Sequence, residues 1–358
     1  MWQLIIFAVP DPRGGAARRS WPLMLARSVV FLVLILVLAC ATMIALAYGP
    51  FPLTVDDVVR ATKRMTGDDM GTVTSGEIVF MRVRLPRVAA DILVGAALSG
   101  AGAAYQTLFR NPLASPDILG VASGAGLGAV LGILMSLSVA GIEAFAFLGG
   151  IATVLLVYLI SASLRGHDRT LVLVLSGVVI GALAGASISL VKILADPYDQ
   201  LPAITFWLLG SLAAIKLSDL AITAPLVLLG VVPLVLERWS IGVLSLGDDE
   251  ARSLGVDVGR LRAVVISAAT LMTASVVAIS GVIGWIGLMM PHVARMLVGP
   301  NFNRLLPASM LLGAAFLLIV DTLARSLGRV ETPVGILTAV LGAPFFLWLL
   351  ARGRRAWG

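Results

Sequence analysis

The sequence predicts an all-α polytopic membrane protein that crosses the bilayer ten times. Of its 358 residues, 59% are hydrophobic and only 13% are charged, and the charged residues are separated by long apolar runs. A bilayer-spanning helix needs roughly 20 apolar residues, which these runs provide. Because water-soluble domains carry about a quarter charged residues, the composition excludes an ordinary soluble protein. It also excludes a disordered chain, which combines low hydrophobicity with high net charge.

The first predicted span, residues 29–48, contains no charge and follows a basic leader, residues 1–27. This run is too long for the apolar part of a secretory signal peptide, and it lacks a clean small-residue cleavage site. We therefore expect a retained first helix. Basic residues favour the cytoplasmic side of a membrane, so the leader and the N-terminus are predicted to be cytoplasmic.

Nine further spans are predicted. The uncharged stretch 263–294 is longer than one span requires, and glycines and Pro291 interrupt it, so we divide it near residues 280–281. An even number of spans places both ends on the same side, which makes the basic tail 352–358 cytoplasmic as well. The apolar transmembrane domain is thus residues 28–351. Its spans are 29–48, 88–109, 118–138, 143–164, 170–191, 220–236, the two halves of 263–294, 305–327 and 333–351.

Small residues recur at helical spacing within these spans. Membrane helices associate through close backbone approach at such residues, because apolar side chains gain little by leaving lipid for one another. We interpret both rows as helix-packing ridges without chemistry. They comprise Gly120, Gly124, Gly128 and Gly132 in one span and Gly177, Gly181 and Gly185 in another.

Several function classes lack their residues in this chain. None of the three lysines follows a glycine, so the GxxxxGK[ST] nucleotide-binding loop is absent. One cysteine excludes a disulfide framework, and the presence of only two histidines disfavours a hydrolytic triad or an intramembrane zinc site. The net charge of +6 is interpreted as membrane topology and not as nucleic-acid binding. No cofactor or metal is expected on this chain.

Charges inside the spans are few, namely Asp91, Asp321 and Arg325 near helix ends. Charged groups within a membrane are costly and usually functional. A proton- or sodium-coupled carrier would show more intramembrane carboxylates, and a membrane enzyme would show His, Asp or Ser clustered at one depth. Both classes remain alternatives, but the sequence favours a passive conduit driven by another chain.

Three segments stand out from the apolar background. Residues 82–126 combine a basic cluster, a helix rich in small residues and a turn with two prolines, which disfavour helix in the residue before them. Residues 244–262 are strongly charged, and Asp248 or Asp249 could cap a short helix that Gly255 ends. A simple solvated loop is the alternative interpretation there. Residues 280–350 loosely repeat the first segment, as in transporters built from two halves.

These segments resemble the FecCD-type permeases, the membrane subunits of type II ATP-binding cassette importers for iron-siderophore, haem and cobalamin. The matching motifs occur in order over nearly the whole chain from about residue 28. They are RLPR at 84–87, NPLASPDILG at 111–120, LGDDEARSLG at 246–255, GLMMPH at 287–292 and LGAPFF at 341–346.

The resemblance implies the roles of particular residues. Arginines at the outer ends of the helices would receive acidic residues of a substrate-binding protein, although lipid-headgroup contact is an alternative for them. A turn and a helix start would form the cytoplasmic gate, and a coupling helix within about 244–257 would contact the ATPase. The docking residues are Arg84, Arg87 and Arg325; the gate residues are Asn111, Leu113, Arg169 and Thr170; the coupling residues are Gly247, Asp248, Glu250, Ala251, Leu254 and Gly255.

The resemblance also implies the partners and the cargo. The chain would pair with a second permease subunit, most simply as a homodimer in the bacterial cytoplasmic membrane. Two ATPase subunits, which hold ATP and Mg²⁺, would bind below it, and a substrate-binding protein above it. Transport would proceed by alternating access. An iron-siderophore is the first expectation for the cargo, and haem or cobalamin is the second.

Overall fold

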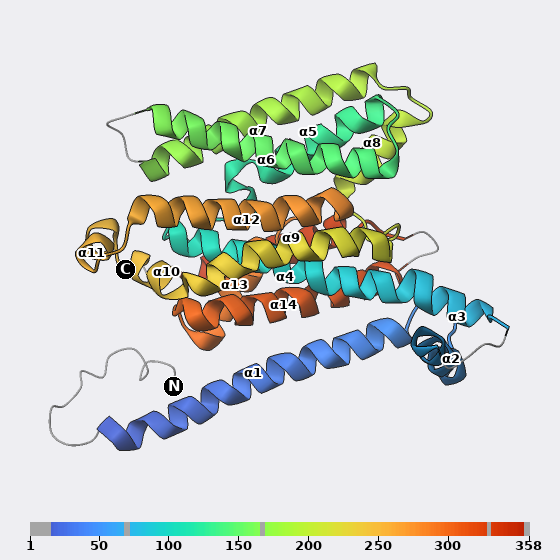
Figure 1. The fold of residues 1–358 in the computed structure, drawn as a ribbon, viewed down its shortest axis with the longest axis horizontal. Helices are drawn as coiled ribbons and strands as arrows, with labels where there is room; N and C mark the ends of the chain where they lie inside the picture. The colour runs from blue at the N-terminus through green and yellow to red at the C-terminus, as the bar shows by residue number, and fades with distance from the viewer. Residues whose placement is uncertain (1–15, 68–71, 165–168, 328–330, 354–358) are drawn as a thin grey trace.

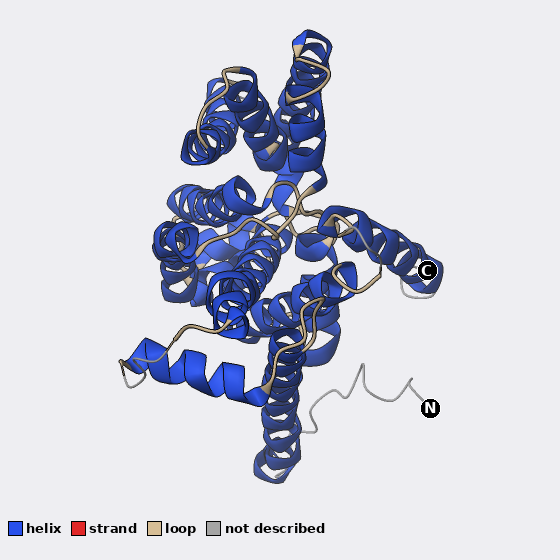
Figure 2. Ribbon diagram, turned by 90° about the vertical axis from the view of Figure 1, so that its right-hand side faces the viewer, coloured by secondary structure: helices blue, strands red, loops and turns tan. Residues whose placement is uncertain are grey.

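The computed structural model describes residues 16–67, 72–164, 169–327 and 331–353, and over these ranges the chain is helical apart from its connections (Figure 2). No strand occurs in the described ranges. The all-α fold class predicted from the sequence is therefore confirmed.

The helices follow one another through short connections. A π-helical turn, Phe80–Arg84, joins α3 to α4, and a 3₁₀ turn, Pro116–Leu119, precedes α5. In chain order the α-helices are α1 (Ala16–Ala47), α2 (Val55–Thr66), α3 (Ser75–Val79), α4 (Leu85–Leu108), α5 (Val121–Leu134), α6 (Val139–Ser163), α7 (Arg169–Leu194), α8 (Gln200–Leu209), α9 (Leu217–Leu236), α10 (Arg238–Leu244), α11 (Asp248–Ser253), α12 (Val258–Ser280), α13 (Ile286–Val298), α14 (Phe302–Ala324) and α15 (Val334–Gly353).

Three helices form the buried centre of the molecule. The most apolar windows of α4, α12 and α14 are 78%, 72% and 61% buried, whereas that of α1 is only 17% buried. The centre is assembled around α4, which packs against α14, α12, α13 and α9. The group α5–α8 lies on one side of it and α1 runs along the other (Figure 1). The outer helices expose apolar faces, as helices in contact with lipid do.

Small residues bring the helices into close contact. A Cβ on Gly95 would lie 2.3 Å from the carbonyl oxygen of Gly313, so α4 and α14 touch through their backbones. The first predicted glycine ridge packs against α6 through its last three members, but Gly120 instead ends the 3₁₀ turn at φ +78°. Only part of the second ridge packs closely. Its first member, Gly177, meets the backbone of Ile118, whereas the other two have loose neighbours or none within 4 Å.

The predicted spans are recovered with changes at their ends. Among the described residues, seven helices are long and apolar enough to cross a membrane, and four further apolar helices are shorter, so the count of ten stays a prediction. The second span, predicted at 88–109, continues back to Ser75. Its π-helical turn lies just before Pro86, whose missing N–H disturbs regular α-helical bonding.

The helices outside the predicted spans include α2 and α8, besides α3, α10 and α11. The first is α2, which begins at a capping box in which Thr54 Oγ1 accepts from the backbone N–H of Asp57 and the Asp57 carboxylate accepts from that of Thr54. The Thr54 hydroxyl also donates to the Asp57 carboxylate at 2.7 Å, and the hydrogen bonds that this carboxylate accepts from the hydroxyl and the backbone of Thr54 lower the pKa of Asp57. The second is α8, a short apolar helix that ends at Gly210 (φ +71°).

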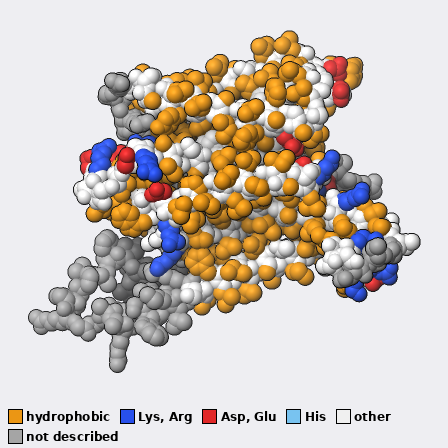
Figure 3. All heavy atoms as spheres, in the orientation of Figure 1, with side chains coloured by type: hydrophobic (Ala, Val, Ile, Leu, Met, Phe, Trp, Pro, Cys, Tyr) orange, Lys and Arg blue, Asp and Glu red, His pale blue; other side chains and the backbone are white. Residues whose placement is uncertain are grey.

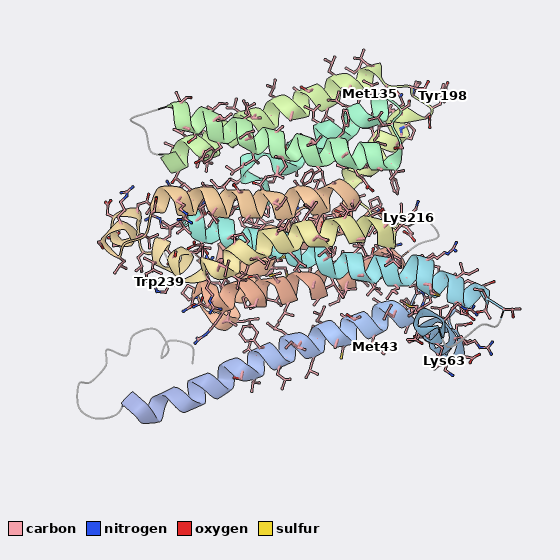
Figure 4. The ribbon with its side chains drawn as sticks, viewed as in Figure 1. Met43, Lys63, Met135, Tyr198, Lys216 and Trp239 are labelled. Carbon is pink, nitrogen blue, oxygen red and sulfur yellow. The ribbon has the colours of Figure 1, made fainter. Side chains whose placement is uncertain are left out.

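The surface shows an apolar belt between two charged ends (Figure 3). One end, called here the α11 end, carries α10 and α11 and the side chain of Trp239 (Figure 4). The opposite end, called the α2 end, carries α2 and α3 together with Lys63, Lys216 and Tyr198 (Figure 4). The first turn of α1 lies towards the α11 end (Figure 1). An apolar belt between charged ends is the surface expected of a helical membrane protein.

Candidate functional site

Charged side chains from separate predicted spans meet between α4 and α14 near the α2 end. Arg87 binds Asp321 through two nitrogens, with Nε 2.9 Å from Oδ2 and Nη2 2.8 Å from Oδ1. The remaining nitrogen of Arg87, Nη1, lies 2.9 Å from Glu331 Oε2. Arg325 Nε lies 3.2 Å from Asp321 Oδ2, and the fully buried Asp91 is one helical turn from Arg87. Breaking a buried pair of this kind typically costs about 3–5 kcal/mol, so the cluster fastens α4 to α14.

Arg84 anchors the end of α1 in a different way. Its guanidinium donates to the backbone carbonyl oxygens of Leu46 at 2.7 Å and Ala47 at 2.8 Å, and also to that of Phe51. These carbonyls include the last ones of α1, which have no partner within the helix. Arg84 therefore closes the C-terminus of α1 and holds the following chain against α4.

The three predicted docking arginines lie near the α2 end, but they are not open to a partner in this conformation. Arg84, Arg87 and Arg325 are only 3%, 4% and 6% exposed, and each finds its partners within the chain. Their docking role stays a prediction. Of their two carboxylate partners, Asp321 is fully buried, whereas 41% of the Glu331 side chain is exposed. Arg82 is exposed in the adjoining π-helical turn.

The turn after α4 presents the first pair of predicted gate residues. Leu113 N–H donates to Asn111 Oδ1 at 2.9 Å, and Ala114 N–H donates to the Asn111 carbonyl at 3.1 Å. In this Asx-type turn, the backbone is fixed by hydrogen bonds to the side chain and the carbonyl of Asn111. Leu113 is left 46% exposed, so the apolar side chain stands on a rigid support and is available for contact.

The second pair lies at the start of α7. Arg169 is the first residue of α7, and its side chain is outside the described residues. Thr170 follows and is half-buried. Residues 165–168, which precede them in the chain, are also outside the described residues. The gate roles of all four residues stay predictions.

The charged segment forms the short helix that the sequence predicts, with a different start. Gly247 is the N-cap at φ +144° and no side chain caps the helix, so the expected Asp248 or Asp249 cap does not form; both belong to the first turn. There their negative charges interact favourably with the positive end of the helix dipole. Gly255, at φ +83°, closes the end of the helix as predicted, since its N–H donates to the carbonyl of Arg252. Gly255 has the left-handed conformation that glycine adopts freely.

Burial divides the predicted coupling residues into two sets. Glu250, Leu254 and Gly255 are exposed at the α11 end and can touch a partner, whereas Ala251 and Gly247 are buried against the chain. Asp248 points inward and pairs with Arg262 at 3.0 Å. An exposed leucine that the sequence analysis missed, Leu246, adjoins this surface at 65% exposure.

A short non-helical segment separates α12 from α13. α12 stops at Gly281 (φ +68°) and α13 resumes only after Trp285 (φ +71°), so residues 281–285 are non-helical within the apolar belt. Irregular backbone at membrane depth is tolerated where it lines a cavity or is buried in protein. A cavity of about 250 Å³ lies here, bounded by this segment together with Ser115, Asp117 and Thr273. A second hollow, next to Leu113, is lined by Trp285 and aromatic residues of α15.

Comparison with known proteins identifies the family of this chain. Residues 33–352 match the FecCD transport family. The chain belongs to this family. It is therefore the permease of an ATP-binding cassette importer, a multi-pass membrane subunit that has no catalytic activity of its own.

Similar proteins carry different cargoes. A Helicobacter pylori protein whose name assigns it to an iron chelatin transport system is 44% identical over 79% of this chain and 85% of its own length. The molybdate import system permease MolB of Haemophilus influenzae is 39% identical over 90% of this chain and 95% of its own. A solved structure described as an inward-facing metal-chelate type ABC transporter superposes with a TM-score of 0.81 at 38% identity, covering 91% of this chain and 99% of the other. The type II importer permease fold is thereby shown.

Proposed function

We propose that this FecCD permease carries a ferric chelate across the bacterial cytoplasmic membrane as one half of a homodimer. The α11 end would receive two ATPase subunits, which hold ATP and Mg²⁺, and the α2 end would receive a substrate-binding protein. Transport would follow alternating access, in which partners shift the balance between two gate states. The chain itself binds no cofactor in this proposal.

The observation that carries the proposal is the exposed α11 surface. Glu250 on α11 and Leu254 and Gly255 just after it are exposed, whereas Ala251 is buried and Asp248 pairs with Arg262 of α12 and Arg110 of the turn after α4. Such a helix fits the groove of a cytoplasmic partner. The family membership makes an ATPase the expected occupant of this surface.

The proposed orientation places the α11 end and both termini in the cytoplasm. The start of α1 lies towards the α11 end (Figure 1), and residues 1–27, which include the first part of α1, are basic. Both features agree with the preference of Lys and Arg for the cytoplasmic side.

The proposed cargo rests on the iron chelatin and metal-chelate relatives. A chelate presents an organic surface that encloses the metal, so a path of apolar and weakly polar side chains suits it. The cavity beside Thr273 is largely of this character, since its lining includes Leu98, Val277 and Ile283, with Asp117 as the one charged residue. Molybdate, the cargo named for one relative, is the second candidate. As a small anion it would require donors or positive charge in the path.

The test is uptake into liposomes that contain the chain with its ATPase subunits, with the binding protein added outside. Radiolabelled ferrichrome, iron(III) citrate, haemin, cobalamin and molybdate serve as separate probes. We expect ATP-dependent accumulation of a ferric chelate and no accumulation of molybdate. Molybdate uptake alone would overturn the cargo. Accumulation driven by a proton or sodium gradient without ATPase subunits would overturn the importer assignment.

A further inference from the structure

One carboxylate joins the coupling helix to the turn that carries Leu113. Asp248 is the first residue of α11, and its Oδ2 accepts from Arg262 Nη2 at 3.0 Å. Its other oxygen, Oδ1, lies 3.9 Å from Nη2 of Arg110. Arg262 is on α12 with its side chain 7% exposed, and Arg110 is the residue immediately before Asn111. Asp248 thus connects α11, α12 and the gate turn.

The backbone at Arg110 indicates that its side chain is needed there. Arg110 has φ +47°, and it lies in a helix-ending turn in which the N–H of Asn111 donates to the carbonyl of Gln106. Turns of this kind usually place glycine at the left-handed position, because a Cβ is strained there. Glycine would adopt this φ without strain. We therefore interpret the strained arginine as a sign that its side chain has a role in this turn.

Arg110 also reaches the backbone at the start of α11. A Cβ on Gly247, the N-cap of α11, would lie 3.5 Å from Arg110 Nη1. The guanidinium therefore lies within ordinary contact distance of the backbone at the start of α11, beside the Glu250 carboxylate, which is the group nearest to that Cβ position. The same arginine side chain makes both this approach and the ion pair.

The neighbouring carboxylate is arranged differently and provides a matched comparison. Asp249 has a side chain that is 93% exposed, and its ion pair at 2.8 Å is with Arg252 of the same short helix. An exposed pair of this kind contributes little. Asp248 and Asp249 therefore share a helix turn and a charge, but only Asp248 contacts the gate turn through an ion pair that the structure shows.

We propose that Asp248 and Arg110 are the positioning residues that pass movement of α11 to the 111–114 turn, with Arg262 holding the carboxylate in place. The inference rests on the proposed function, in which α11 contacts the ATPase and Leu113 belongs to the gate. Coupling between two sites requires contacts that differ between two states. The ion pair supplies such a contact, because a displacement of α11 changes the distance between the charges.

The experiment reads the gate turn directly and needs no cargo. The full chain, with Cys40→Ser and Leu113→Cys, is purified with its ATPase subunits in nanodiscs. The rate at which a water-soluble maleimide modifies the introduced thiol at position 113 is measured without nucleotide and with ATP, Mg²⁺ and vanadate. Arg110→Gly, Asp248→Asn, their combination and Asp249→Asn are compared in this background. Arg110→Gly removes the guanidinium and places a residue that adopts the left-handed conformation freely at this position.

We expect nucleotide to change the modification rate in the reference protein and in Asp249→Asn by about fivefold or more, the lower range of ordinary allosteric coupling. In Arg110→Gly and Asp248→Asn the change should fall below about twofold, and the combined variant should be no worse than either single one. A nucleotide response that persists in both single variants, while the ATPase still co-purifies, overturns the inference. A reference protein without any response would overturn the proposed function and this inference with it.

Discussion

At the scale of single residues, Arg87, whose docking role is a prediction, is held by carboxylates of its own chain. Two of its nitrogens face Asp321 and the third faces Glu331. Asp321 is fully buried, whereas Glu331 is part-exposed. A carboxylate arriving from a binding protein would therefore compete with Glu331 and leave the inner pair intact.

This competition gives a prediction for Glu331→Gln. If Arg87 docks the binding protein, removal of the internal carboxylate should strengthen capture of the loaded binding protein, since a charge-assisted bond to the rival acceptor is lost. The expected gain is about threefold to tenfold in Kd, corresponding to roughly 1 kcal/mol. Binding to nanodisc-embedded complex is measured at physiological salt.

Asp56→Asn is the matched control, because Asp56 pairs with Arg60 on the exposed surface of α2. It should leave Kd nearly unchanged. A Glu331→Gln complex that binds no more tightly than the unaltered one would indicate that Arg87 serves only to fasten α4 to α14.

The sequence predicted the charged residues within the spans but not their contacts with one another. The sequence could identify Asp91, Asp321 and Arg325 as costly charges within spans, because charge in an apolar run is visible in one dimension. It could not show that they meet, since α4 and α14 lie far apart along the chain. The same holds for Arg110 and Arg262, whose common partner Asp248 is a product of the fold.

At the scale of elements, the helices of the centre are held together by backbone contact. The closest approach is at the crossing of α4 and α13, where a Cβ on Gly102 would lie 1.9 Å from the carbonyl oxygen of Gly287. Neither an added Cβ at Gly102 nor the carbonyl oxygen of Gly287 can move without displacing a helix. The crossing also borders the interrupted segment 281–285, so its spacing determines the shape of the cavity there.

We therefore predict that Gly102→Ala separates α4 from α13. Overpacking in a close-packed core typically costs about 1–3 kcal/mol, and the midpoint of thermal unfolding in detergent should fall accordingly. Gly185→Ala on α7 is the control, because a Cβ there has no neighbour within 4 Å. It should be neutral or slightly stabilising, since Ala is favoured over Gly within a helix. Equal melting temperatures for the two variants would contradict this account of the crossing.

Periodicity and hydropathy predicted the long helices because both properties are local. They did not predict α2, whose apolar positions are interrupted by charges, although its capping box from Thr54 to Asp57 is readable in the sequence. They also did not predict that the helix containing the second span begins before it, at Ser75. The basic residues at 82–87 resembled a membrane boundary, but in the fold Arg84 and Arg87 are satisfied by carbonyls and carboxylates and the helix continues through them.

At the scale of the whole molecule, the two charged ends of the permease are connected by both continuous and interrupted helices. α4 runs from the cluster around Arg87 to the turn at Asn111, so one helix joins the predicted docking arginines to the predicted gate turn. Segments 109–120 and 281–285 interrupt the regular helices elsewhere in the bundle. A conformational change passed between the ends would use the rigid helix for transmission and the interrupted segments for the change of shape.

In the proposed function, α11 is the helix at which the ATPase starts that conformational change. Gly255 has φ +83° and ends α11, so proline, which is fixed near φ −65°, cannot occupy the position without rebuilding the end of the helix. Gly255→Pro should therefore abolish ATP-dependent uptake while the chain still inserts and purifies, because Gly255 lies on the exposed surface outside the apolar belt. Gly255→Asn is the control. Asparagine tolerates the left-handed conformation, and a Cβ at this position has no neighbour within 4 Å. This variant should keep most of the uptake, provided that glycine is needed for its backbone alone. Uptake by the proline variant at the rate of the unaltered protein would exclude the α11 end as the place where ATP hydrolysis is coupled to transport.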